Sequence, residues 1–208
     1  MESKLVVCNE IIVDPARSEV AWDAWKHQKY EVGTKKIKRV AYRCEDEPAR
    51  FLELISIDDI SELSEIIKLK DQLPDFFYSY LKSDWHQQVV ELLDVVRPTG
   101  ELLPTDKKLQ LRYIEVPLSV FDEYREWREN TIYDVVKNSD SINGFLAYQS
   151  VFSTKPGVLF MSTFEGNTKD YMKQNFLTER YQGIVKEAGD RYIVGGKDGL
   201  FARVYARC

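Results

Sequence analysis

The chain contains an internal repeat, which limits the folds open to it more than any other feature of the sequence. The segment 80–94 (YLKSDWHQQVVELLD) aligns without gaps on 176–190 (FLTERYQGIVKEAGD). Upstream of these segments, 40–44 (VAYRC) matches 146–150 (LAYQS). Because the matches follow the same order in both halves, duplication of one structural unit is the economical explanation. A fold for this chain must therefore be built from the same elements twice.

Each half predicts the element order β-α-β-β-α-β. Short apolar runs rich in β-branched and aromatic residues predict strands over 4–13, 37–44, 50–57 and 95–103, and again over 109–116, 144–152, 157–164 and 192–206. Helical periodicity and capping residues predict helices after Asp14-Pro15, over 60–69 and 76–93, after Ser119, and over 169–188. This order is the ferredoxin-like split motif, in which helices cover one face of an antiparallel sheet.

In two such units, the face of each sheet that is not packed on helices is expected to be buried against the sheet of the other unit. The connection 97–108 contains Pro, Gly and Thr, so we expect the units to be residues 1–103 and 104–208. Helices can bury only one face of a sheet, yet the first predicted strand is apolar on both: Leu5, Val7, Ile11 and Val13 on one side, Val6, Cys8 and Ile12 on the other. The predicted fold class is therefore α+β: two fused ferredoxin-like β-α-β-β-α-β units whose antiparallel sheets pack into an intramolecular α/β barrel.

The composition excludes several classes of protein. A net charge of -5 argues against non-specific binding to nucleic acid or anionic membranes. No apolar run approaches the roughly 18 residues of a membrane helix, and the start of the chain lacks a signal-peptide pattern. Three cysteines without CxxC spacing predict reduced thiols in a cytoplasmic protein. With two histidines, a zinc site built from Cys and His pairs is excluded.

The element order resembles that of the dimeric α/β-barrel superfamily, which includes antibiotic-biosynthesis-type monooxygenases, haem-degrading monooxygenases and polyketide cyclases. The resemblance covers nearly the whole chain as two fused copies. It implies a pocket for a small-molecule ligand, by analogy an aromatic one, between the helices and the sheet. It also implies either a monomer with an internal pseudo-dimer or a homodimer.

The strand VVCNEIIV and the segment YLKSDWHQQV resemble the haem-degrading branch of that superfamily. That branch has an asparagine in its first strand, which Asn9 matches. Tyr80 stands where the branch has a tryptophan, and Val90 where it has its iron-binding histidine. His86 precedes Val90 by one turn of the predicted helix, so haem is a candidate cofactor with His86 as its ligand. Otherwise we expect neither a cofactor nor a metal.

Three polar residues are candidates for catalysis. Asn9 is in phase with Leu5, Val7 and Ile11, which places its amide on an otherwise apolar face of the first strand. The amide could stabilise an oxyanion, and His86 or His27 could move a proton. Each has an ordinary interpretation as well: a locally hydrogen-bonded amide for Asn9, and exposed helix positions for the two histidines.

The candidate substrate-binding residues are aromatic, with one arginine. Aromatic side chains could line a pocket for a flat substrate, although an ordinary helix-to-sheet core is the default for any one of them. An arginine on a strand needs an acidic partner or a ligand if it is buried. The candidates are Trp25, Tyr80, Trp85, Arg112 and Trp127. The charge runs 35–39 and 45–47 are expected to be solvated.

Three hypotheses for function follow, and the sequence does not decide whether the chain is an enzyme. The first is a cofactor-independent monooxygenase acting on an aromatic or polycyclic small molecule, as the resemblance implies. The second is a haem-binding or haem-degrading protein. The third is a non-catalytic ligand-binding or scaffold protein of the same fold, which the absence of a close acid-base pair in the sequence keeps open.

Overall fold

The computed structural model describes residues 2–28, 31–32, 35–154 and 157–207. The first half contains β1 (Leu5–Ile12), α1 (Ser18–Lys26), the short pair β2 (Glu31–Val32) and β3 (Lys35–Lys36), β4 (Arg39–Cys44), β5 (Arg50–Ile57), α2 (Leu63–Leu69), α3 (Asp75–Tyr80) and β6 (His86–Arg97). The second half contains β7 (Lys108–Ile114), α4 (Phe121–Asn130), α5 (Ile132–Lys137), β8 (Gly144–Phe152), β9 (Val158–Phe164), α6 (Thr168–Asn175), α7 (Glu179–Arg191) and β10 (Phe201–Ala206). The boundary expected between 103 and 104 falls in the connection from β6 to β7.

Eight antiparallel strands close into one barrel in the order β1-β5-β4-β10-β7-β9-β8-β6. Within each half the last strand lies beside the first, which is the strand order of the ferredoxin-like motif. The halves join because β6 of the first pairs with β8 of the second, and β10 of the second pairs with β4 of the first. Closure leaves no edge of the barrel unpaired, and it confirms the predicted fold class.

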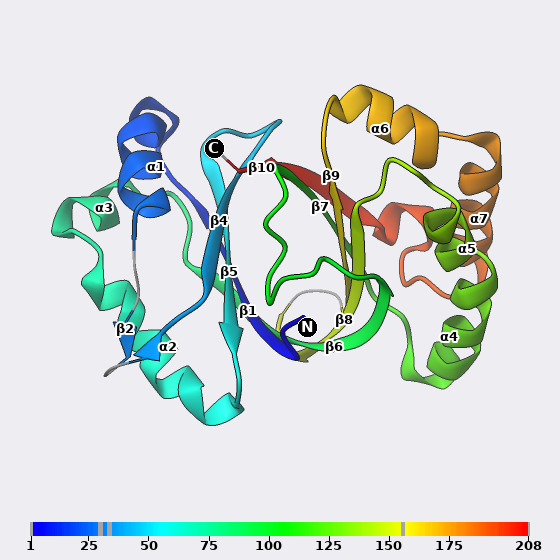
Figure 1. Ribbon diagram of the computed structural model, residues 1–208, viewed down its shortest axis with the longest axis horizontal. Coiled ribbons are helices and arrows are strands. Elements are labelled where there is room, and N and C mark those ends of the chain that lie inside the picture. Colours follow the sequence, from blue (N-terminus) through cyan, green and yellow to red (C-terminus); the bar gives the residue numbers. More distant parts are fainter. Residues whose placement is uncertain (1, 29–30, 33–34, 155–156, 208) are drawn as a thin grey trace.

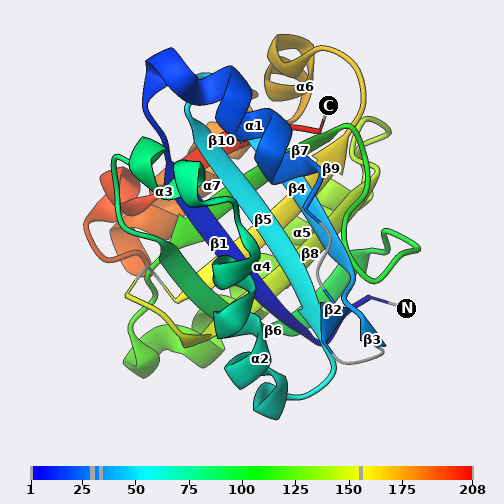
Figure 2. The same ribbon diagram turned by 90° about the vertical axis from the view of Figure 1, so that its left-hand side faces the viewer.

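The helices lie on two opposite sides of the barrel (Figure 1). Helices α1, α2 and α3 cover one side, where they lie over β1 and β5 (Figure 2), and α4 to α7 cover the other side. In the part of the chain that the structure describes, no helix combines the length and apolar character needed to span a bilayer.

Each strand of the barrel has one face toward the helices and one toward the barrel interior. In β1, Val6 and Cys8 pack inside the barrel, whereas Val7 and Ile11 pack beneath helices. This explains why both alternating sets of the first strand are apolar, as the sequence indicated. The interior is filled by side chains from both halves, among them Leu52, Leu54, Val90, Leu109, Leu111, Leu146, Tyr148, Leu159, Met161 and Tyr205.

One predicted helix is wrong. The helix expected over 76–93 ends at Tyr80, and the residues from His86 onward form strand β6. Pairing with both β1 and β8 decides this, because only an extended segment can close the barrel between these two strands. The gap-free match of 80–94 with 176–190 therefore aligns a strand with helix α7. By contrast, 40–44 and 146–150 lie in β4 and β8, which are equivalent strands of the two halves.

The remaining differences concern the ends of elements and one predicted helix that is divided in two. The strand expected over 192–206 is confined to Phe201–Ala206, because Gly195 and Gly196 both have positive φ (80° and 66°) and turn the chain before it. The strand expected over 95–103 ends at Arg97. The helix expected over 169–188 is two helices, α6 and α7, with Thr178 as the N-cap of the second.

Candidate functional site

The layer between β1, β5 and the helices of the first half contains a buried polar network. Asn9, 2% exposed, faces this layer together with Val7 and Ile11, the residues with which it is in phase along the strand. Its Nδ2 donates to Glu53 Oε2 (2.7 Å), and its Oδ1 accepts from Gln87 Nε2 (3.0 Å). Glu53 and Gln87 are the residues paired with Asn9 on the two neighbouring strands, so the barrel register itself brings the three side chains together.

Glu53 is completely buried and paired with Arg39. The Arg39 Nε donates to Glu53 Oε1, while Nη2 donates to the Trp25 carbonyl (2.7 Å) and Nη1 to the Gln28 carbonyl (3.1 Å). The guanidinium thus joins the end of α1 to the sheet. Arg39 was expected to be solvated with its charge run; that expectation is wrong, since the side chain is 6% exposed. Sequence reasoning also missed Glu53, although it is the only charged residue in the apolar run 51–57.

This network fixes the orientation of two amides. An ionised carboxylate can only accept hydrogen bonds, so Asn9 must present its NH2 group to Glu53 and its carbonyl oxygen to Gln87. Gln87 must then present its own NH2 group to Asn9. The Gln87 carbonyl oxygen and one of its N–H groups remain for a further partner. The buried charge of Glu53 therefore determines which way the exposed amide of Gln87 presents its oxygen and its NH2 group.

An apolar groove of about 170 Å³ lies beside Gln87, between α2 and the start of β6. An apolar cavity of about 150 Å³ is known to hold benzene, so the groove has room for one aromatic ring. Ile67 and Phe152, both more than half exposed, form part of its rim. Its lining is Val7, Leu63, Ile66, Ile67, Gln87, Gln88, Val89 and Phe152.

Two of the predicted tryptophans meet in the same layer. Trp25 is completely buried, stacks on Phe77 (ring centroids 5.5 Å apart) and lies 5.2 Å from Trp85. The indole nitrogens of Trp25 and Trp85 are buried and have no hydrogen-bond partner among the described residues. Tyr80, at the end of α3, packs against the edge of this aromatic cluster.

The two histidines lie apart from Asn9. His27 follows α1, its side chain is 70% exposed, and its Nδ1 lies 3.0 Å from the Asp23 carbonyl oxygen. His86 is on strand β6 rather than on a helix, and it pairs with Glu10. Glu10 alternates with Asn9 along β1, so His86 is on the opposite face of the sheet from Asn9, and it is exposed. The structure therefore does not bring the three predicted catalytic residues together.

These positions do not fit a histidine-bound haem. Neither of the chain's two histidines faces the layer that holds Asn9, so neither could bind iron there. Among the residues that the structure describes, no group of three or more His, Cys, Asp or Glu side chains could hold a metal ion. We therefore assign no chemistry to haem.

A haem titration tests this conclusion. Addition of haemin to the wild type and to His86→Ala should give the same Soret absorbance, since an exposed strand residue turned away from the buried layer contributes no iron site. Thermal unfolding of the two proteins should also agree, because substitutions at such positions change stability by about 0.5 kcal/mol or less. A saturable Soret shift in the wild type that disappears in His86→Ala would contradict the assignment.

The other two predicted residues belong to the second half, on the opposite side of the barrel (Figure 1). Arg112 on β7 is 5% exposed and faces the layer under α6 and α7, where its guanidinium lies 3.5 Å from the Phe176 ring centroid. Trp127 on α4 is half-buried and lies 5.2 Å from the Tyr192 ring. Neither residue contacts the Asn9 network.

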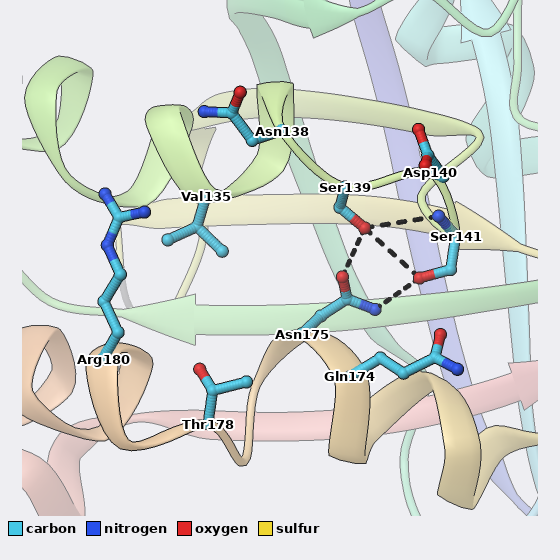
Figure 3. Close-up of a pocket in the computed structure, with 9 residues that line it drawn as sticks. All are labelled: Val135, Asn138, Ser139, Asp140, Ser141, Gln174, Asn175, Thr178 and Arg180. Atoms are coloured by element: carbon cyan, nitrogen blue, oxygen red, sulfur yellow. Dashed lines mark hydrogen bonds between the residues drawn. The ribbon is translucent and has the colours of Figure 1, made fainter.

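A polar cleft of about 620 Å³ lies where the end of α5 approaches α6 and α7. At its centre Asn175 accepts from Ser139 and donates to Ser141 Oγ (2.7 Å) and the Tyr171 carbonyl (2.8 Å), as Figure 3 shows for the two serines. These bonds use both the oxygen and the NH2 group of the Asn175 side chain. We therefore interpret the cluster as a structural contact that holds the 138–141 loop against α6.

Comparisons with known proteins agree on the fold. No protein-family model matches the sequence, and no curated protein matches it either. Among solved structures, an anthrone oxidase-like protein is 12% identical, with 100% of this chain and 92% of that chain covered and a TM-score of 0.70. A proposed monooxygenase from Fusobacterium nucleatum subsp. nucleatum is 9% identical (99% and 93% covered, TM-score 0.68).

A mutant chlorite dismutase from Candidatus Nitrospira defluvii is also similar, at 9% identity (99% and 92% covered, TM-score 0.55). Identities this low establish the fold and leave the activity open. The chain has the fold of the dimeric α/β-barrel superfamily, with both units of the barrel in one polypeptide.

Proposed function

We propose that this chain is a cofactor-independent oxygenase that oxidises an aromatic or polycyclic small molecule in the first-half groove. One observation carries the proposal: Gln87 lines an apolar groove that has room for one aromatic ring. The orientation of the Gln87 amide is fixed by Asn9, which is itself oriented by the buried Glu53. Apolar sites with a few oriented polar groups are the usual form of small-molecule sites. The likeness to an anthrone oxidase-like protein and to proposed monooxygenases supports the same class of reaction.

The reaction would convert an activated methylene group of the substrate to a carbonyl group. One atom of dioxygen becomes the carbonyl oxygen, and the other leaves as water with the two hydrogens of the methylene. Loss of a proton from the methylene gives an enolate, whose delocalised electrons reduce dioxygen. The remaining N–H group of Gln87 is the group that could stabilise the enolate oxygen, since Gln87 lines the groove. One ring of the substrate would lie in the groove, which has room for a single ring, and the rest of a polycyclic substrate would extend beyond it.

The residues that line the groove include no titratable side chain, which narrows the proposed substrate class. The two histidines considered as proton carriers lie on other surfaces, and Glu53 is occupied by Asn9 and Arg39. We therefore propose a substrate acidic enough to ionise in water near neutral pH, such as a phenol-substituted aryl ketone with a benzylic methylene. The protein would then bind the anion rather than generate it.

Oxygen consumption with 1,8-dihydroxyanthrone as the probe tests the proposal. The wild type should accelerate oxygen uptake over buffer, and Asn9→Ala should lower turnover, because Gln87 would lose the acceptor that orients its amide. Gln87→Leu removes the donor that lines the groove and should lower turnover by about 10²–10³-fold, as removal of one oxyanion donor does elsewhere; it also takes from Asn9 Oδ1 the donor that Gln87 provides. The matched control is Gln174→Leu, an amide in the polar cleft of the other half, which should leave turnover unchanged.

Two outcomes would overturn the oxygenase proposal. Wild-type rates equal to those of buffer would remove the activity with this substrate class. Quenching of tryptophan fluorescence by the probe without oxygen uptake would instead favour the non-catalytic ligand-binding hypothesis. Far-UV circular dichroism of each variant establishes that lost turnover does not come from unfolding.

A further inference from the structure

The second half contains two buried arginines in contrasting surroundings. Arg128, 1% exposed, forms an ion pair with Asp94 Oδ2. Arg112, 5% exposed, forms no ion pair with any carboxylate of the described residues. A buried charge without a counter-charge is strongly unfavourable, so Arg112 requires an explanation that Arg128 does not.

The contacts of Arg112 orient its guanidinium without neutralising it. Nη1 donates to the Tyr181 hydroxyl, and the guanidinium carbon lies 3.5 Å from the Phe176 ring centroid and 5.2 Å from that of Tyr181. Cation–π contacts attract the charge but leave it in place. The Nε–H is buried and has no partner among the described residues.

Arg112 lines a small, largely closed cavity of about 20 Å³ together with Tyr124. The Tyr124 hydroxyl is also buried; it lies beside the guanidinium of Arg128, which can only donate to it, so its own O–H remains available as a donor. Burial raises the pKa of Tyr124, so the hydroxyl stays protonated at neutral pH and can donate. Most of the remaining wall is aliphatic or aromatic, including Ile114, Ile132, Phe160 and Ile184. A positive charge and two unused donors thus line a small space whose described walls hold no carboxylate.

We propose that this cavity binds a monovalent anion, held by the guanidinium of Arg112 and the hydroxyl of Tyr124. The volume suits one halide-sized ion, since it is close to that of a single water molecule. The same donors would hold the anionic oxygens of a small carboxylate whose body displaces part of the apolar wall. The site is in the other half from the proposed oxygenase groove, so the two proposals stand or fall separately.

Thermal unfolding of the full chain in different sodium salts tests the proposal. Bromide and formate, compared with gluconate at equal ionic strength, should raise the Tm by about 3–5 °C at ten times the dissociation constant. Crystals soaked in sodium bromide should give an anomalous peak beside Arg112 Nε. Benzoate is the third salt tested. A rise in Tm with benzoate equal to that with formate would identify the ligand as a carboxylate with an apolar body. A rise in Tm with bromide and formate alone would identify the ligand as a free small anion.

Three variants separate this site from general salt effects. Arg112→Met should abolish the anion response and stay folded, because apolar replacement of an unpaired buried charge is well tolerated. Tyr124→Phe removes one donor and should weaken the response. Arg128→Met should keep the response while lowering the starting Tm. Equal Tm values in all salts with no bromide peak, or an undiminished response in Arg112→Met, would overturn the proposal.

Discussion

Replacement of Arg39 by methionine is expected to lower the free energy of unfolding by about 3–5 kcal/mol. The substitution would leave the carboxylate of Glu53, which is completely buried, with Asn9 as its only described hydrogen-bond partner. It would also remove the donors to the Trp25 and Gln28 carbonyls that hold the end of α1 against the sheet. Urea denaturation followed by circular dichroism measures the loss, and the Tm should fall by about 2–4 °C for each kcal/mol.

The double variant Arg39→Met, Glu53→Met is the control for this prediction. Removing both charges leaves neither one buried alone, so the double variant should be more stable than Arg39→Met. If Arg39→Met were as stable as the wild type, the ion pair would contribute nothing to the layer. The orientation that we assign to the Asn9 and Gln87 amides would then have no physical basis.

The second large effect is expected at Trp25. Trp25→Ala should destabilise the protein by about 3–5 kcal/mol, because it would open a cavity in a fully buried aromatic cluster. The guanidinium of Arg39 lies 5.4 Å from the Trp25 ring centroid, so the substitution would also remove a cation–π contact from the same layer. Denaturation of the variant by urea measures this cost directly.

The second half of the chain supplies the matched control for Trp25. Trp127 occupies the corresponding helix of the second half but is only half-buried, so Trp127→Ala should cost distinctly less. A small effect of Trp25→Ala, comparable to that of Trp127→Ala, would contradict the prediction. Such a result would mean that the layer around Trp25 adapts easily, and it would favour the role in substrate stacking that the sequence suggested for this residue.

The sequence predicted part of the site correctly where the alternation of side chains along one strand is enough to place a residue. The alternation of β1 predicted that Asn9 shares a face with Leu5, Val7 and Ile11, and the structure shows that this face lies under the helices, with Asn9 2% exposed. Sequence reasoning failed for Arg39 and Glu53, which appear in the sequence as one member of a charge run and one isolated acidic residue. The two are 14 positions apart and meet only because β4 and β5 pair, so each neutralises the other where neither could be buried alone.

The sequence by itself determined the features that depend on neighbours along the chain. The order of elements, the bounds of β8 and the start of the first helix at Asp14-Pro15 follow from side-chain period and capping, which are local. Only the tertiary structure decided that 86–97 is a strand, because that segment must pair with β1 and β8 to close the barrel. The side-chain period of a segment shows which of its residues share a face. The strand with which a segment pairs is a long-range contact, and the local pattern does not encode it.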